Sequence, residues 1–158
     1  LGAGRVVGAA RDAAALERLR ARGLADAVVA LGGTDDAVAL KAVAGEGFDV
    51  VLDGVCGAPM LAALKATRWG ARILTVGTGG GREVKLDIAD LLFRTPSCVG
   101  TGQRSASDRE ATWRRLLRMA HEHRITFDHV GYRFDQMPDA WASQVAGPHA
   151  KITASLKA

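Results

Sequence analysis

The stretch FDVVLDGVCGAPMLAALKATRWGARILTVGTGGG, residues 48–81, decides the fold of this chain. It opens with a short apolar run, Phe48–Val55, which predicts a buried strand. A helix is predicted from Pro59, a residue that suits a first helical turn, to about Trp69. A second apolar run, Ala71–Gly77, predicts another strand. A buried strand, a helix and a buried strand in this order are typical of a unit whose two strands are parallel.

The same alternation continues on both sides of this stretch. Asp12, Thr34 or Asp35, and Asp108 can each cap the helix that follows them. Apolar strands separated by helices indicate a parallel sheet that is covered on both faces. The predicted fold class is therefore α/β, with a doubly wound parallel sheet. The other predicted strands are Val6–Ala10, Ala27–Leu31, Ser97–Thr101, Asp128–Val130 and Ala150–Leu156, and the other predicted helices cover residues 13–22, 35–44, 87–93, 109–123 and 138–146.

The composition limits the classes of function. The 158 residues, 48% hydrophobic and 24% charged, are typical of one globular domain of ordinary size. The net charge of +4 is scattered, and acids interrupt its densest basic stretch, residues 109–124, which argues against a nucleic-acid partner. No apolar run is long enough for a membrane span. Cys56 and Cys98 form no CxxC pair, so we expect no disulfide framework and a cytoplasmic location.

The turns that follow the predicted strands are the candidate functional residues. In a doubly wound sheet, ligands bind beyond the carboxyl ends of the strands. Four of the five turns contain glycine, which lets backbone approach a ligand closely, although tight turns also need glycine without any ligand. The turns are Arg11-Asp12, Gly32-Gly33, Gly54-Val55-Cys56-Gly57, Gly77-Thr78-Gly79 and Gly100-Thr101-Gly102.

Several segments match a known superfamily in their order and separations. On these segments the chain resembles the cofactor domain of the medium-chain dehydrogenase/reductase superfamily, which includes zinc alcohol dehydrogenases and zinc-independent quinone oxidoreductases. The resemblance covers nearly the whole chain and implies a Rossmann-type fold that binds a nicotinamide dinucleotide. The segments are GAGRVVGAARD and ADAVV, then FDVVLDGVCG, WGARILTVGTGGG and LLFRTPSCVGTG, and finally FDQMPDAWASQVAGPHAKI.

The resemblance also implies parts that this sequence does not contain. The family's first strand and its glycine fingerprint, which cradles the pyrophosphate, are expected roughly 25 residues upstream of Arg5. Gly2-Ala3-Gly4 precedes a strand and so does not match that fingerprint. The sequence also lacks an initiator Met. We interpret it as the C-terminal part of a longer enzyme, with a partial dinucleotide-binding domain over residues 1–130 and a segment returning toward an absent substrate domain over residues 131–158.

The strand order of the fold makes this expectation specific. In the order 3-2-1-4-5-6 the expected first strand is central. The chain should therefore show a gap between its own first and third strands. We expect the chain by itself to be marginally stable unless it closes the gap or dimerises.

The cofactor assignment depends on the end of the first strand. Relatives that prefer NAD carry an acid at the position of Ala10, and here Arg11 follows it. A guanidinium pairs well with a 2′-phosphate, which favours NADP over NAD. The alternative is that Arg11 is an exposed turn residue and that Asp12 only caps a helix.

By resemblance, the remaining cofactor-binding residues belong to four other segments. The turn after the third strand is expected near the nicotinamide ribose, and the turn after the fourth is expected to bind the carboxamide through its backbone. Gly100 and Thr101 are expected close to the nicotinamide ring. The C-terminal cation is expected to reach the pyrophosphate, although a solvated lysine is an equally good interpretation. These other residues are Val55, Cys56, Gly57, Val76, Gly77, Thr78 and Lys151.

The remaining expectations concern dimerisation, catalysis by cysteine and metal binding by histidine. The edge strand Ser97–Thr101 is expected to pair with a second subunit as a homodimer. No base accompanies Cys56 in the sequence, so a catalytic role is not assigned. His121 and His123 are two apart and do not share a helical face, and no metal site is assigned to this segment.

Two classes of function follow from these observations. The first is the cofactor-binding portion of an NADPH-dependent oxidoreductase that reduces a carbonyl, an activated alkene or a quinone by hydride transfer. Its nearest alternative is a zinc-dependent alcohol dehydrogenase that uses NAD or NADP. The second class is a non-catalytic, truncated Rossmann module. The catalytic residues and the small-molecule substrate are not determined by this segment.

Overall fold

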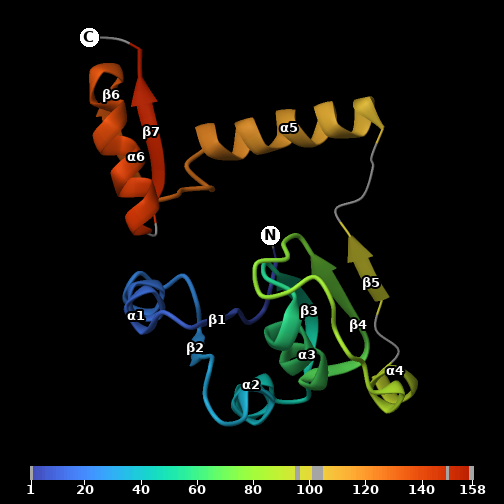
Figure 1. Ribbon diagram of the computed structural model, residues 1–158. Coiled ribbons are helices and arrows are strands. Elements are labelled where there is room, and N and C mark those ends of the chain that lie inside the picture. Colours follow the sequence, from blue (N-terminus) through green and yellow to red (C-terminus); the bar gives the residue numbers. More distant parts are fainter. Residues whose placement is uncertain (1, 95–96, 101–104, 149, 157–158) are drawn as a thin grey trace. The chain divides into compact units, whose positions relative to one another are not determined.

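The segment that decides the fold contains β3, Phe48–Asp53, α3, Gly57–Lys65, and β4, Thr67–Thr75 (Figure 1). This computed structural model describes residues 2–94, 97–100, 105–148 and 150–156. The two strands pair in parallel, as predicted. The described chain divides into two compact units, residues 1–102 and 103–158. The predicted division at residue 130 concerns a substrate domain outside this sequence and stays a prediction.

The helix α3 is shorter than predicted. It ends at Lys65 and not near Trp69, which belongs to β4. The hydroxyl of Thr67 donates to the carbonyl oxygen of Leu64 at 2.6 Å, which satisfies one of the helix's last acceptors. Phe48 then pairs with Thr67 before the register shifts. Strand pairing therefore begins at Thr67, within the range over which the sequence pattern predicted a helix.

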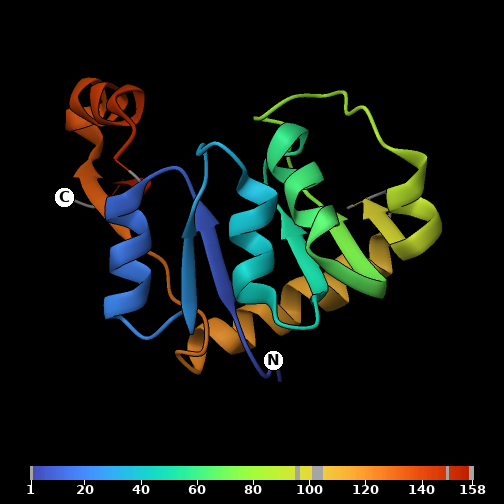
Figure 2. The ribbon, with the colours of Figure 1, turned by 90° about the horizontal axis from the view of Figure 1, so that it is seen from below.

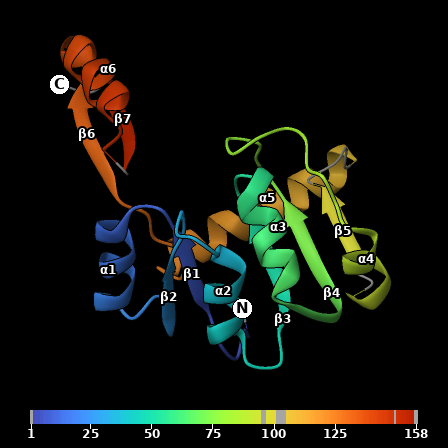
Figure 3. The same ribbon diagram turned by 60° about the horizontal axis from the view of Figure 1, so that its bottom comes forward.

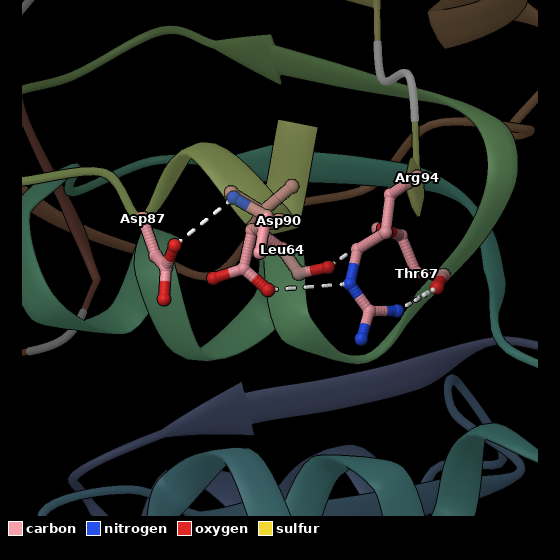
Figure 4. A network of polar contacts seen from close by, with 6 residues as sticks. Leu64, Thr67, Asp87, Asp90 and Arg94 are labelled. Atoms are coloured by element: carbon pink, nitrogen blue, oxygen red, sulfur yellow. Dashed lines mark hydrogen bonds and ion pairs between the residues drawn. The ribbon is translucent and has the colours of Figure 1, made fainter. Parts of the chain in front are cut away.

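An arginine attaches α4, Ile88–Arg94, to this junction (Figure 4). The Nη1 of Arg94 donates to the carbonyl oxygen of Thr67 at 2.8 Å. Its Nε makes a long contact of 3.5 Å with Asp90, one helical turn earlier. Arg94 thus links the last helix of this unit to the start of β4.

The rest of the first unit repeats the strand and helix alternation. Every strand pair in it is parallel, and the strands form a β1–β2 pair and a three-stranded sheet in the order β3-β4-β5. This confirms the α/β class with parallel strands. The elements are β1, Val7–Ala10, α1, Ala13–Ala21, β2, Ala27–Ala30, α2, Asp36–Ala44, α4, Ile88–Arg94, and β5, Ser97–Gly100.

The backbones of β1 and β3 are not hydrogen-bonded to each other. The helix α2 lies between them in Figures 2 and 3. One apolar cluster nevertheless extends across this gap. It contains Leu40 of α2 and Val29 of β2, with Val7 of β1 and Phe48 of β3 packed against it. The predicted gap between the first and third strands is therefore confirmed, and apolar side chains pack across it.

Two helices of the first unit, α1 and α2, are capped by aspartates. The Oδ1 of Asp12 accepts hydrogen bonds from the amides of Ala14, at 2.9 Å, and Ala15, at 3.1 Å. The Oδ1 of Asp35 accepts from the amide of Val38 at 3.0 Å. Both caps satisfy amides that a helix cannot pair internally, so Asp12 has the predicted role and Asp35, not Thr34, begins α2.

The second unit contains two α-helices, a short 3-10 helix and a two-stranded parallel pair, β6 with β7. Its longest helix begins at Ser105, whose Oγ accepts from the amide of Asp108 at 3.1 Å and donates to that residue's carboxylate at 2.7 Å. The cap is therefore Ser105 and not Asp108, because the helix starts one turn earlier than predicted. The elements are α5, Ala106–His121, β6, His129–Arg133, the short helix η1, Phe134–Gln136, α6, Met137–Ala146, and β7, Lys151–Ser155.

In the described ranges, no helix combines the length and the apolar character that crossing a membrane requires.

Candidate functional site

A buried aspartate shapes the turn after β3. Asp53 is the last residue of that strand and is 5% exposed. Its Oδ1 accepts hydrogen bonds from the amides of Val55, at 3.1 Å, and Cys56, at 2.8 Å. Its Oδ2 is buried and has no hydrogen-bond partner among the described residues. An aspartate that bonds to amides two and three residues ahead is a common way to close such a turn.

The backbone that follows this aspartate is strained. Cys56 has a φ of 60°, a conformation that a residue with a side chain rarely adopts, and Gly57 follows with a φ of 65°. Cys56 is buried and stands immediately before α3. Strained backbone of this kind persists only where its surroundings hold it, and it is concentrated at functional sites.

The turn after β4 packs directly against the turn after β3. The amide of Val76 donates to the carbonyl oxygen of Asp53 at 2.8 Å, and the amide of Gly80 donates to that of Val55 at 2.6 Å. A Cβ added at Gly57 would lie 2.3 Å from the carbonyl oxygen of Gly80. The two turns therefore form one closely packed backbone surface at the carboxyl ends of β3 and β4.

The outer side of this surface combines apolar side chains with backbone donors. Val55 is 42% exposed and Val76 is 55% exposed. Thr78 is also exposed. Within the described part of the chain, no hydrogen bond engages the amides of Gly77 or Thr78. Such a surface can bind a flat, partly polar group through its backbone.

The structure places Arg11 at the corresponding end of β1. Its side chain is exposed and lies beside Gly32, the glycine after β2, since a Cβ added there would be 3.8 Å from the Cγ of Arg11. Among the described residues, none forms an ion pair with this guanidinium. The guanidinium of Arg11 is thus accessible to an anionic ligand at the end of the β1–β2 pair.

The other predicted residues are placed less completely. Gly100 ends β5 and pairs with Thr75 of β4, at the same end of the sheet as the two turns. Thr101 lies outside the described residues. β5 pairs only with β4 in the described structure, so its other edge has no strand partner there.

Lys151 belongs to the second unit. It is the first residue of β7, it is exposed, and its amide donates to the carbonyl oxygen of Asp128 at 2.8 Å. It borders a cavity of about 600 Å³, whose other lining residues are Phe127, Asp128, Gln144, Gly147, Pro148 and Ala150.

Asp53 is the site residue that the sequence reasoning missed. The available signal was an acid at the last position of an apolar strand, directly before a glycine. The predicted residues Val55, Cys56, Gly57, Val76, Gly77 and Thr78 are brought together. Asp53 contacts both turns, the first through its side chain and the second through its backbone carbonyl, which accepts from the amide of Val76.

Comparison with known proteins gives the family. Residues 1–122 match the family described as zinc-binding dehydrogenase. The chain belongs to the zinc-binding dehydrogenase family. The expected family resemblance is therefore confirmed, and the match covers most of the chain. A comparison with curated proteins finds no significant match.

Solved structures show the same fold for this chain. An alcohol dehydrogenase zinc-binding domain protein from Burkholderia ambifaria is 19% identical, with a TM-score of 0.81 over 99% of this chain and 43% of the other. A thermostable alcohol dehydrogenase from Pyrobaculum aerophilum is 26% identical, with a TM-score of 0.71 over 96% of this chain and 43% of the other. CurA from Vibrio vulnificus, solved with NADPH, is 18% identical, with a TM-score of 0.72 over 98% of this chain and 50% of the other.

The chain thus spans half or less of the length of these structures. The predicted Rossmann-type fold is confirmed. Within the described ranges, no three His, Cys, Asp or Glu side chains come together as a metal site. These described residues by themselves therefore do not fit a zinc ion.

Proposed function

We propose that this chain is the C-terminal, cofactor-binding portion of an NADPH-dependent oxidoreductase that reduces a carbonyl, an activated alkene or a quinone. The observation that carries the proposal is the surface formed by the turns after β3 and β4. It lies at the carboxyl ends of parallel strands, where ligands bind in folds of this type. Membership of a dehydrogenase family supports the assignment to an oxidoreductase.

The two turns have separate tasks in this proposal. The amides of Gly77 and Thr78 donate to the carboxamide of the nicotinamide, and Val76 covers an apolar part of the ring. Val55, Cys56 and Gly57 contact the nicotinamide ribose. When bound, the dinucleotide supplies the hydride, and the chain contributes binding and orientation. Gly100 and Thr101 complete the ring contacts.

Arg11 carries the preference for NADPH over NADH. A guanidinium forms paired hydrogen bonds with a phosphate, and no described residue competes for this one. The 2′-phosphate of NADPH offers such a partner, whereas the 2′-hydroxyl of NADH offers no charge.

The pyrophosphate requires a donor group from elsewhere in the protein. The unpaired edges of β1 and β3 can receive one further parallel strand, whose following glycine turn would bind the pyrophosphate. Lys151 supplies a cation to the same group. The strand β5 pairs with its copy in a second subunit, which makes the enzyme a homodimer.

The test exchanges the charge at Arg11 and measures the binding of NADPH and NADH by calorimetry. Arg11→Glu should lower the affinity ratio of NADPH to NADH by about 10-fold or more, equivalent to about 1.4 kcal/mol. The matched control is Arg5→Glu, which makes the same charge change before β1, at the amino end of the strand. That variant should leave the ratio unchanged.

Two results would count against the proposal. An unchanged ratio in Arg11→Glu would remove the role of Arg11 and with it the preference for NADPH. A folded, dimeric chain that binds neither dinucleotide would favour a non-catalytic Rossmann module.

A further inference from the structure

Only one of the two carboxylate oxygens of Asp53 accepts hydrogen bonds from the described residues. Oδ1 holds the amides of Val55 and Cys56, while Oδ2 is buried without a partner among the described residues. A buried acceptor that lacks a donor costs stability. Stability alone therefore does not explain an aspartate at position 53. The hydrogen bonds that its Oδ1 accepts are the contacts that shape the turn after β3.

This contact opposes a specific strain. Cys56 has a φ of 60° and a ψ of −160°, a backbone conformation that is unfavourable for every residue except glycine. The amide that Asp53 holds most closely, at 2.8 Å, is that of Cys56 itself. Removing the acceptor would let Cys56 relax toward a negative φ and move the carbonyl groups on either side of it.

The opposite side of the turn has no room for such a movement. The carbonyl oxygen of Val55 accepts from Gly80, and a Cβ added at Gly80 would lie 3.0 Å from the carbonyl oxygen of Cys56. The turn is thus held between Asp53 and the loop after β4. A relaxed Cys56 would displace both halves of the nicotinamide surface.

We propose that Asp53 is a positioning residue for the nicotinamide half of the dinucleotide, an inference that rests on the proposed function. Asp53 is too buried to touch the ligand and acts through the amides of Val55 and Cys56. Arg11 belongs to a different turn and serves the adenosine half. The two halves of the cofactor therefore depend on different residues.

The experiment measures two half-ligands by calorimetry on the 158-residue chain. Reduced nicotinamide mononucleotide probes the nicotinamide half, and 2′,5′-ADP probes the adenosine half. Asp53→Ala should raise the Kd of the mononucleotide about 10-fold, as expected for a lost buried hydrogen bond, and leave that of 2′,5′-ADP within about 2-fold. Circular dichroism confirms that each variant is folded.

Two further variants separate positioning from general stability. Asp53→Asn keeps one acceptor oxygen and should stay within about 3-fold of the wild type for the mononucleotide, a change below that of one hydrogen bond. Adding Cys56→Gly to Asp53→Ala should restore most of the lost affinity, because glycine adopts a positive φ without the side chain's strain. A role in stability alone predicts no such rescue of binding.

The outcomes distinguish this inference from the proposed function. Unchanged mononucleotide binding in Asp53→Ala, an equal loss of both half-ligands, or no rescue by glycine would each overturn the role of Asp53. A wild-type chain that binds neither half-ligand would overturn the proposed function, and the positioning role with it.

Discussion

The Cα of Gly77 and the carbonyl oxygen of Gly54 are in such close contact that a Cβ added at Gly77 would lie 2.1 Å from that oxygen. Gly54 follows β3 and Gly77 follows β4, so this contact joins two turns that are more than twenty residues apart in the sequence. Backbone, rather than side chains, makes the contact. The candidate site thus depends on residues without a side chain at defined positions.

Gly77→Ala is expected to destabilise the chain by about 1–3 kcal/mol, the usual cost of forcing extra volume into a packed region. The φ of Gly77 is not in the left-handed range, so the cost comes from the collision and not from the backbone conformation. Urea unfolding measures it. The matched control is Gly79→Ala, where an added Cβ meets nothing within 4 Å. Equal stability of the two variants would contradict the prediction.

Thr67→Val should cost about 1–3 kcal/mol, because it leaves the buried carbonyl of Leu64 without the hydroxyl that bonds it at 2.6 Å. Thr67 is 3% exposed, so water does not readily replace the lost donor. Thr67→Ser keeps the hydroxyl and serves as the control in thermal or urea unfolding. If valine is tolerated as well as serine, this hydrogen bond does not hold the end of α3.

Arg133→Gln should raise the pKa of Asp135 toward its ordinary value of 3.8. The hydrogen bond from the Arg133 guanidinium lowers the pKa of Asp135 in the folded state. The pair's stabilising contribution is therefore present above about pH 3.8 and is lost as the pH falls through the folded pKa. It is small, because both side chains are exposed.

An NMR titration of the Asp135 carboxyl carbon checks this shift. Arg114→Gln is the control, since Arg114 pairs with Glu110 on α5 and should leave the Asp135 titration unchanged. A pKa that does not move in Arg133→Gln would show that the guanidinium is not its cause.

The unpaired edges of β1 and β3 predict weak cooperativity for the 158-residue chain by itself. The backbones of β1 and β3 are not hydrogen-bonded to each other, and apolar side chains pack across the gap between them, so the two sheets lack the hydrogen bonds of one continuous sheet. We expect marginal stability or self-association, measured by urea unfolding together with analytical ultracentrifugation. A monomer that unfolds in one steep transition would contradict this expectation.

Amide hydrogen exchange offers a more local measurement of the same feature. β4 has a partner on each side, so its amides should exchange more slowly than those of β1 and β3. Similar protection in all three strands would indicate that the gap is closed in solution.

Most of the fold could be predicted because its elements differ in local pattern. Short apolar runs such as Phe48–Asp53 and glycine-bounded helices such as α2 are visible without any tertiary information. The errors lie at boundaries. Residues 67–69 fit a helix or a strand by composition, and pairing of Thr67 with Phe48 places them in β4. Ser105 and Asp108 are both good caps, and local geometry selected the serine.

The sequence predicted which turns form the candidate site but not the hydrogen bonds that hold these turns together. Val55–Gly57 and Val76–Thr78 were expected because they follow strands, and parallel strands end at the same edge. Asp53 was missed because its importance lies in hydrogen bonds to backbone amides, and an acid at a strand end has no unique local signature.

Local periodicity and the positions of glycine were sufficient to obtain a parallel α/β chain and the end of its sheet at which a ligand would bind. They sufficed because both depend on neighbours within a few residues. The contact between Gly54 and Gly77, the clamp of Asp53 on Cys56 and the separation of β1 from β3 appeared only in three dimensions. The Gly54–Gly77 contact and the separation of β1 from β3 depend on how remote segments pack. Asp53 and Cys56 are three residues apart, and their hydrogen bond depends on the backbone conformation of the turn, which the local pattern does not specify.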